Sequence, residues 1–293
     1  MRRFSAIVRA TALEILSEPL SLLVLLAALA LTVLAPAFHY HQFGEPTRMA
    51  RDAGLSAVFT CGSVMAVFGT IRAFRREVES GTLEMALAHP ISRGGFFLAK
   101  SSGALVAYLG FSLIVFLTSE TIVEGAAIGG AIAAGTGDVA HVFGPCLAAG
   151  VGVLVLSLVI GAAVNRFAHC RFVLSCFASA AVLALLSGGY CIWLDASLFL
   201  SLLPAAVLLV FPAGVLLSAA AAFSVRLPAN AAASAVGVVF LIMLPAAGNY
   251  YKANALSNGG RIPWSYVGLA ALAALPALAL FLLVGIRFAE GKR

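Results

Sequence analysis

The side chains that could do chemistry are few, and none of them forms a complete catalytic set. Gly135-Thr136-Gly137-Asp138 matches GxGD, a pattern in which a membrane-embedded aspartate can hydrolyse peptide bonds. That chemistry requires a second aspartate close enough for the two carboxylates to share a proton. The other two aspartates, Asp52 and Asp195, fall at predicted outer loops. We therefore expect that this chain is not an enzyme.

A metal site is the second kind of chemistry to consider. His39, His41 and His141 are all expected on the outer side, with Glu45 and Asp52 near the first pair. Imidazoles and a carboxylate can converge on a metal ion, but exposed interfacial histidines are the commoner case. The five cysteines show neither a CxxC pair nor a zinc-like spacing with histidine. We predict no metal and no cofactor in this chain.

The composition indicates a membrane protein. Of the 293 residues, 62% are hydrophobic and 10% are charged, and the mean hydropathy is +1.06. So few polar side chains cannot cover a water-facing surface, so the surrounding medium must be lipid. The net charge of +6 comes from basic residues at the ends of apolar runs. This placement indicates membrane orientation rather than nucleic-acid binding.

Eight apolar stretches are long enough to cross a bilayer, which needs roughly 17 to 25 residues each. They predict an all-α fold, a polytopic transmembrane helical bundle that forms one domain over residues 1–293. The alternative is six spans plus re-entrant or split helices, because Pro204 and Pro212 interrupt the sixth stretch. Residues 125–135 are too short to span and predict a surface loop or a re-entrant piece. The eight stretches are 20–38, 55–71, 101–119, 142–164, 172–194, 197–223, 229–247 and 265–287.

The basic residues predict the orientation of these spans. With the N-terminus inside, the inner segments hold fourteen of the 18 Lys and Arg, and the outer segments hold Arg48, Arg51, Lys252 and Arg261. Cytoplasmic loops carry the excess of basic residues. We therefore expect both termini to be cytoplasmic. Residues 1–17 place apolar side chains at helical spacing and predict an amphipathic helix in the membrane interface.

Residues 72–93, between the second and third predicted spans, form the longest charged stretch and are predicted to be cytoplasmic. Ser80 or Thr82 can cap a helix there, with Glu84 in its first turn. Leu83 and Leu87 share one face of this short helix with Ala86, and Pro90 ends it. A partner that displaced such a helix would move the spans on both sides. A simple loop helix at the lipid surface is the alternative reading.

The same stretch resembles a known family. Glu79-Ser80-Gly81-Thr82-Leu83-Glu84, followed by His89-Pro90-Ile91-Ser92-Arg93, resembles the E-x-G-T-L-E … P-[IV]-S-R segment of ABC-2 type ABC transporter permeases. Residues 7–14 are similar to the family's stretch before the first span, and residues 223–228 resemble its S-T-R-L-P turn. The chain departs from the family in having Ala86 at a position that is usually bulky, and eight predicted spans where six are common.

The resemblance implies that residues 72–100 are a coupling segment that docks on a cytoplasmic ATPase. Gly81 would permit entry into the coupling helix, Leu83 and Leu87 would supply its apolar face, and Glu79 and Glu84 would pair with basic groups. Arg93 and Lys100 would anchor the segment at the lipid headgroups. The implied coupling residues are Glu79, Gly81, Thr82, Leu83, Glu84, Leu87, Pro90, Ser92 and Arg93.

The resemblance implies a multi-pass permease of the bacterial inner membrane that exports an unknown substrate with a second permease subunit, identical or related. ATP and Mg would be bound by separate ABC ATPase subunits, because the chain has no GxxxxGK[ST] loop. Its Leu186-Ser187-Gly188-Gly189 lies inside an apolar stretch and is read as a chance match to an ATPase signature. The alternative is a secondary transporter or channel without an ATPase. The predicted spans argue against it because none of their cores contains Asp, Glu, Lys or Arg.

Overall fold

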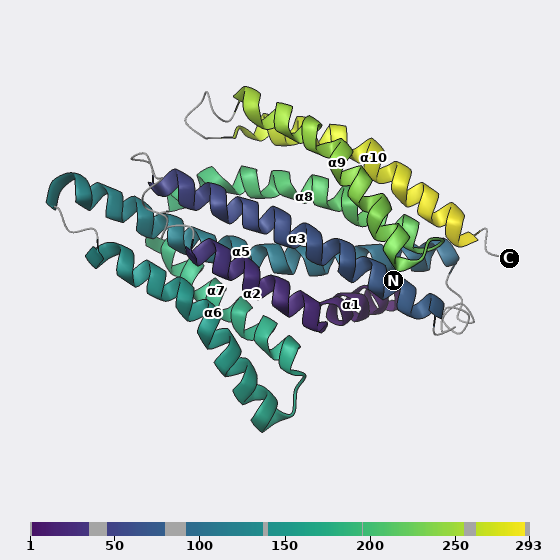
Figure 1. Ribbon diagram of the computed structural model, residues 1–293, viewed down its shortest axis with the longest axis horizontal. Coiled ribbons are helices and arrows are strands. Elements are labelled where there is room, and N and C mark those ends of the chain that lie inside the picture. The colour runs from purple at the N-terminus through teal and green to yellow at the C-terminus, as the bar shows by residue number, and fades with distance from the viewer. Residues whose placement is uncertain are drawn as a thin grey trace. The chain divides into compact units, whose positions relative to one another are not determined.

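The chain folds into helices throughout the part that the structure describes. The structure is a computed structural model that describes residues 2–34, 46–79, 92–136, 140–194, 196–254 and 262–290, and no strand occurs among them. The prediction of an all-α, polytopic membrane protein is confirmed. In chain order (Figure 1) the helices are α1 (Arg2–Leu16), α2 (Pro19–Leu34), α3 (Pro46–Glu79), α5 (Arg93–Thr136), α6 (Ala140–Ala168), α7 (Phe172–Leu194), α8 (Ala196–Ser224), α9 (Ala229–Asn254) and α10 (Trp264–Glu290).

Each of the eight predicted spans corresponds to one helix. Six of these helices are long and apolar enough to cross a membrane in their described residues, namely α3, α5, α6, α7, α8 and α10. The α2 helix has only 16 residues, and a break at Ser17 and Glu18 separates it from α1. If α1 and α2 count as one broken span, the total is seven. Both Pro204 and Pro212 lie inside the single helix α8.

Two helices extend well beyond their apolar stretches. The α3 helix continues past Ile71 to Glu79, and the 44-residue α5 begins at Arg93 and ends at Thr136. At 1.5 Å per residue, α5 is about 66 Å long, more than twice the thickness of the hydrocarbon core. The prediction of a loop or re-entrant piece at residues 125–135 is therefore wrong. These residues continue the helix, since the Ala and Ile residues between the glycines have a higher helix propensity than glycine.

The chain divides into two compact units. Unit 1 comprises Met1–Ile15, Ser63–Leu109 and Leu202–Arg293, and unit 2 comprises Leu16–Gly62 and Gly110–Ser201. Unit boundaries fall inside α3, α5 and α8, so each of these three helices contributes residues to both units.

Unit 1 is built on close contacts between α3, α8 and α9. Ile71 of α3 packs with Leu216, Ala219 and Ala220 of α8 and with the small buried residues of α9. Small residues let membrane helices approach closely, which increases their van der Waals contact. The α10 helix adds Phe281, whose ring meets that of Phe223 edge-on at 5.9 Å.

Unit 2 contains an α6–α7 hairpin (Figure 1). A Cβ atom on Gly161 of α6 would lie 2.3 Å from the Cys176 Sγ of α7, so only glycine fits this crossing. The Ser179 hydroxyl donates a 2.9 Å hydrogen bond to the Ser157 carbonyl of the other helix. In the same unit α6 packs on α5 and α2. A Cβ atom on Gly150 of α6 would lie within 3 Å of both Ile122 of α5 and Val33 of α2.

Candidate coupling site

The predicted coupling residues lie mostly outside the described part of the chain. Gly81, Thr82, Leu83, Glu84, Leu87 and Pro90 fall in residues 80–91, of which nothing is described. Glu79 is the last residue of α3, and its side chain is not described either. Ser92 and Arg93 are described, and both are exposed. The structure thus defines the two helix ends between which this segment runs.

Ser92 forms the start of α5. Its Oγ accepts a 3.1 Å hydrogen bond from the Gly95 amide, and its carbonyl accepts one of 3.0 Å from the Phe96 amide. This is the geometry of an N-cap, in which a serine hydroxyl satisfies an amide of the first helical turn. The sequence resemblance placed Ser92 in the coupling motif, and the structure gives it this capping contact.

Lys100 lies buried between α3 and α5, with 1% of its surface exposed. Its Nζ is 2.7 Å from Glu77 Oε1 and donates a hydrogen bond to the Ala73 carbonyl. The ammonium also lies 5.4 Å from the ring centroid of Phe74 and 5.9 Å from that of Phe96. The expectation that Lys100 anchors the segment at lipid headgroups is wrong. The buried ammonium is satisfied within the protein. The Glu77 carboxylate, the Ala73 carbonyl and the Phe74 ring of α3 surround it, together with the Phe96 ring of α5.

An aromatic contact lies beside this ion pair. The Phe74 and Phe97 rings are 5.4 Å apart and tilted by 54°. A Cβ atom on Gly285 of α10 would lie 2.2 Å from the Phe97 ring, so α10 crosses α5 at this glycine. Nearby, a Cβ on Gly94 would lie 3.2 Å from Ile286 of the same helix. The first turns of α5 therefore pack on both α3 and α10.

The amphipathic helix α1 packs on the same two helix ends. Arg76 of α3 donates a 3.2 Å hydrogen bond to Glu14 of α1. A Cβ on Gly103 of α5 would lie 2.7 Å from both the Val8 carbonyl oxygen and the Thr11 Cβ. The α1 helix lies within residues 1–17, and its Ala12 and Ile15 are buried in unit 1, while its place in the membrane interface stays a prediction. The ends of α3 and α5 are thus held between α1 and α10.

The turn at residues 223–228 is the second stretch that the sequence singled out. The Arg226 and Leu227 amides both donate hydrogen bonds to the Phe223 carbonyl, at 3.1 and 2.8 Å. The Arg226 guanidinium lies 4.5 Å from the Phe288 ring centroid of α10. This turn joins α8 to α9 and connects them to the end of α10, within the same unit as the ion pair.

The remaining sequence candidates form no chemical site in the described residues. Gly188 of the Leu186–Gly189 stretch packs against Leu117 inside unit 2. His39, His41, Glu45 and Asp138, and the side chain of His141, lie outside what is described. Within the described ranges, no group of three metal-ligating side chains occurs.

Sequence reasoning missed two buried acids in α5. Glu120 and Glu124 lie one helical turn apart with 4% and 8% of their surface exposed. Within the described residues, the Oε1 atom of Glu120 has no hydrogen-bond partner. The predicted span ended at Ser119, whereas the apolar helix continues to Gly125. The signal available in the sequence was the position of Glu120, which directly follows the span boundary.

The ends of α3 and α5 that flank residues 80–91 in the sequence are held together by side-chain contacts. These contacts comprise one buried ion pair, one exposed ion pair and one aromatic pair. A force applied to residues 80–91 would act on α3 and α5 together, because Lys100 and Glu77 join the two helices.

One comparison with known proteins gives a match. A family model described as ABC-2 family transporter protein matches residues 17–187, which is more than half of the chain and includes residues 80–91. No curated protein and no solved structure matches the chain.

Proposed function

Because this chain belongs to the ABC-2 family of transporter proteins, we propose that it works as a permease subunit driven by ATPase chains that dock on residues 80–91. Two permease chains, identical or related, would assemble with two cytoplasmic ATPases that bind ATP and Mg. The complex would export a substrate across the bacterial inner membrane. The observation that carries this proposal is the Lys100–Glu77 contact, which joins the two helices that flank residues 80–91.

The mechanism follows from this connection. When the ATPases close on ATP, they would push residues 80–91, and the ends of α3 and α5 would move as one body. Breaking the contact between Lys100 and Glu77 would leave a buried charge without its partner, which costs roughly 3 to 5 kcal/mol. Because of that cost, a push on residues 80–91 would displace α3 and α5 within the membrane and would not pull their ends apart. Such small shifts at a packed interface can switch a bundle between two arrangements.

Co-purification tests the docking step. The permease and its candidate ATPase are co-expressed, and the ATPase recovered with the solubilised permease is quantified. We expect Leu83→Asp to remove most of the recovered ATPase, because it places a charge on the apolar docking face. Phe167→Asp is the matched control, since Phe167 is an apolar residue, 85% exposed, at another predicted cytoplasmic turn. If the Leu83→Asp permease is monodisperse by size exclusion and recovers as much ATPase as the unsubstituted permease, docking at this segment is refuted.

The buried acids give a specific reason to test the alternative, an ion-coupled carrier. Ionisable residues inside membrane spans commonly mark proton or cation pathways, and α5 contains Glu120 and Glu124. Transport in proteoliposomes distinguishes the two functions. We expect uptake to require ATP and the ATPase chains, and to persist when an ionophore collapses the ion gradients. Substrate movement with an ion gradient alone would favour the carrier.

A further inference from the structure

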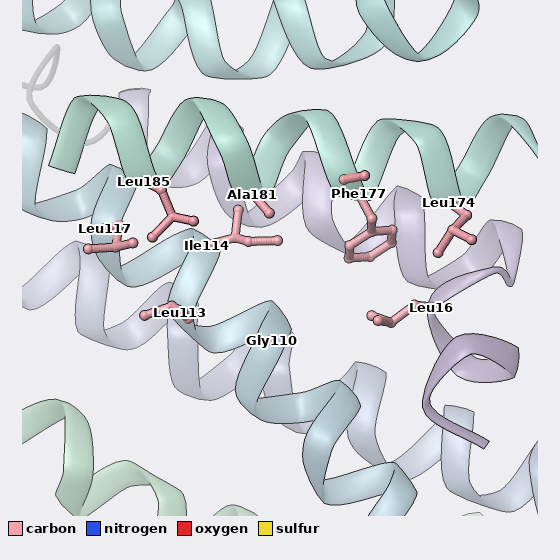
Figure 2. A pocket seen from close by; sticks show the side chains of 10 residues that line it. Leu16, Gly110, Leu113, Ile114, Leu117, Leu174, Phe177, Ala181 and Leu185 are labelled. Atoms are coloured by element: carbon pink, nitrogen blue, oxygen red, sulfur yellow. The ribbon is translucent and has the colours of Figure 1, made fainter. Parts of the chain in front are cut away.

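Unit 2 contains an apolar groove between α5 and α7. It has a volume of about 230 Å³ and is lined by Leu16, Gly110, Leu113, Ile114, Leu117, Leu174, Phe177, Ala178, Ala181 and Leu185. Figure 2 shows Leu174, Phe177, Ala181 and Leu185 along one face of α7. Ala181 and Leu185 lie near Ile114 and Leu117 of α5, and Phe177 and Leu174 lie at the end of the groove near Leu16. Leu113 and Leu185 are half exposed, so the groove opens to the outside of the chain. A cavity lined only by apolar groups does not hold water.

The ends of α7 indicate how deep the groove lies in the bilayer. At one end, exposed Tyr190 and Trp193 stack with ring centroids 6.3 Å apart, as residues of an interfacial aromatic belt do. At the other end, exposed Arg171 directly precedes the helix. The 23 residues of α7 are about 34 Å long, which matches the hydrocarbon core. The groove begins at Leu174 and extends about 16 Å to Leu185, and so occupies the leaflet on the arginine side.

A structured basic turn lies at the arginine end of this groove. The Asn165 side chain donates a 2.6 Å hydrogen bond to the Cys170 carbonyl, and His169 adopts a left-handed φ of 52°. These two features close the turn between α6 and α7. Exposed Arg166 lies in the last turn of α6, and exposed Arg171 directly precedes α7. Arg171 precedes Leu174 by three residues, the spacing that places side chains on one helix face. The Arg171 carbonyl already accepts the Ser175 amide at 3.0 Å, so Arg171 continues the α7 register.

We propose that this groove holds one acyl chain of an anionic phospholipid of the surrounding bilayer, whose phosphate is bound by Arg171 and Arg166. The apolar lining accommodates only hydrocarbon, and the groove opens where lipid chains surround the protein. Arginine is suited to the other end of such a ligand, because its planar guanidinium binds a phosphate in a bidentate manner. Basic residues between membrane helices on the cytoplasmic side recognise anionic headgroups in this way. The lipid would stabilise the α5–α7 contact, and its binding does not require an ATPase.

Photocrosslinking of the purified full-length protein tests this site. The probe is phosphatidylglycerol with a diazirine in its acyl chain, added to the protein in detergent micelles. We expect crosslinks in residues 110–117 and 174–185. Unlabelled phosphatidylglycerol should compete at about tenfold lower concentration than phosphatidylcholine with the same chains, the difference expected for one charge-assisted hydrogen bond.

Two pairs of variants separate the groove from the basic turn. Gly110→Phe should reduce crosslinking several-fold by filling the groove, whereas Gly237→Phe should not, although a Cβ meets open space at both glycines. Leu113→Trp obstructs the same groove and replaces Gly110→Phe if that variant does not fold. Arg171→Gln should remove the preference for phosphatidylglycerol, and Arg287→Gln, at an exposed arginine of unit 1, should retain it. Crosslinks unaffected by the groove variants, or equal competition by the two lipids with the unsubstituted protein, would overturn the proposal.

Discussion

The two ends of α5 bury charged side chains in opposite ways. In unit 1, Lys100 is surrounded by Glu77, the Ala73 carbonyl and two phenylalanine rings. In unit 2, Glu120 is equally buried and is followed one turn later by another acid, Glu124. One Glu120 oxygen has no hydrogen-bond partner in the described residues. The same helix therefore contains one ionisable group surrounded by partners and one with an oxygen that has no partner in the described residues.

This difference indicates different roles for the two ends. A buried charge surrounded by partners holds helices in a fixed arrangement, because removing any partner is costly. A buried polar group without a partner costs stability, and such groups persist where they serve function. The Lys100 end therefore has the partners that hold α3 and α5 together, whereas the Glu120 end contains a buried polar group that costs stability. The predictions below test that difference through the stability of variants.

The largest effect is expected at Glu77. Replacing Glu77 with Ala leaves the Lys100 ammonium buried without its carboxylate, and we expect a loss of roughly 3 to 5 kcal/mol. The measurement is the melting temperature of the purified protein in detergent. The double variant Glu77→Ala/Lys100→Met should recover most of the loss, because it removes the charge as well. If the double variant melts no higher than the single one, Lys100 is not stabilised mainly by this pair.

A smaller effect is expected from the close approach of α1 to α5. Gly103→Ala places a methyl group 2.7 Å from the Val8 carbonyl oxygen. The helices must separate, at a cost of about 1 to 3 kcal/mol. Gly110→Ala on the same helix is the control, since its Cβ meets nothing within 4 Å. It should be neutral or stabilise the protein by up to about 1 kcal/mol through helix propensity. Equal melting temperatures for the two variants would contradict the described α1–α5 contact.

At the other end of α5, substitution should raise stability. Glu120→Met keeps the length of the side chain and removes the unpartnered oxygen, so we expect a gain of about 1 kcal/mol. If this end forms part of the transport path, the same variant loses substrate transport while its melting temperature rises. A variant that melts lower, or one that transports normally, would remove the contrast between the two ends of α5.

The sequence predicted where the membrane helices lie, but for several of them not where they end. Apolar length located α7 at residues 172–194, the bounds that the structure has. It could not show that α3 and α5 continue into charged residues, because those extensions depend on contacts between helices. Lys100 and Glu77 are 23 positions apart and follow no local spacing rule. Their pairing depends on how α3 and α5 pack against each other, which the sequence does not show. Glu120 was missed for a related reason. When hydropathy is averaged along the sequence, a single acidic residue is taken as the end of a span and not as part of it.

The smallest effect is expected at the exposed ion pair that joins α1 to α3. Arg76 and Glu14 approach to 3.2 Å, but the Arg76 side chain is 65% exposed. Exposed pairs contribute about 0.2 to 1 kcal/mol, and salt screens them. Arg76→Gln should therefore lower the melting temperature slightly in low salt and have no effect in about 1 M salt, where the screening length falls to about 3 Å. The loss caused by Glu77→Ala should persist in the same salt, because burial protects that pair from screening. A similar salt response for both variants would show that the Lys100 end is open to solvent, and the proposed rigid connection between α3 and α5 would fail.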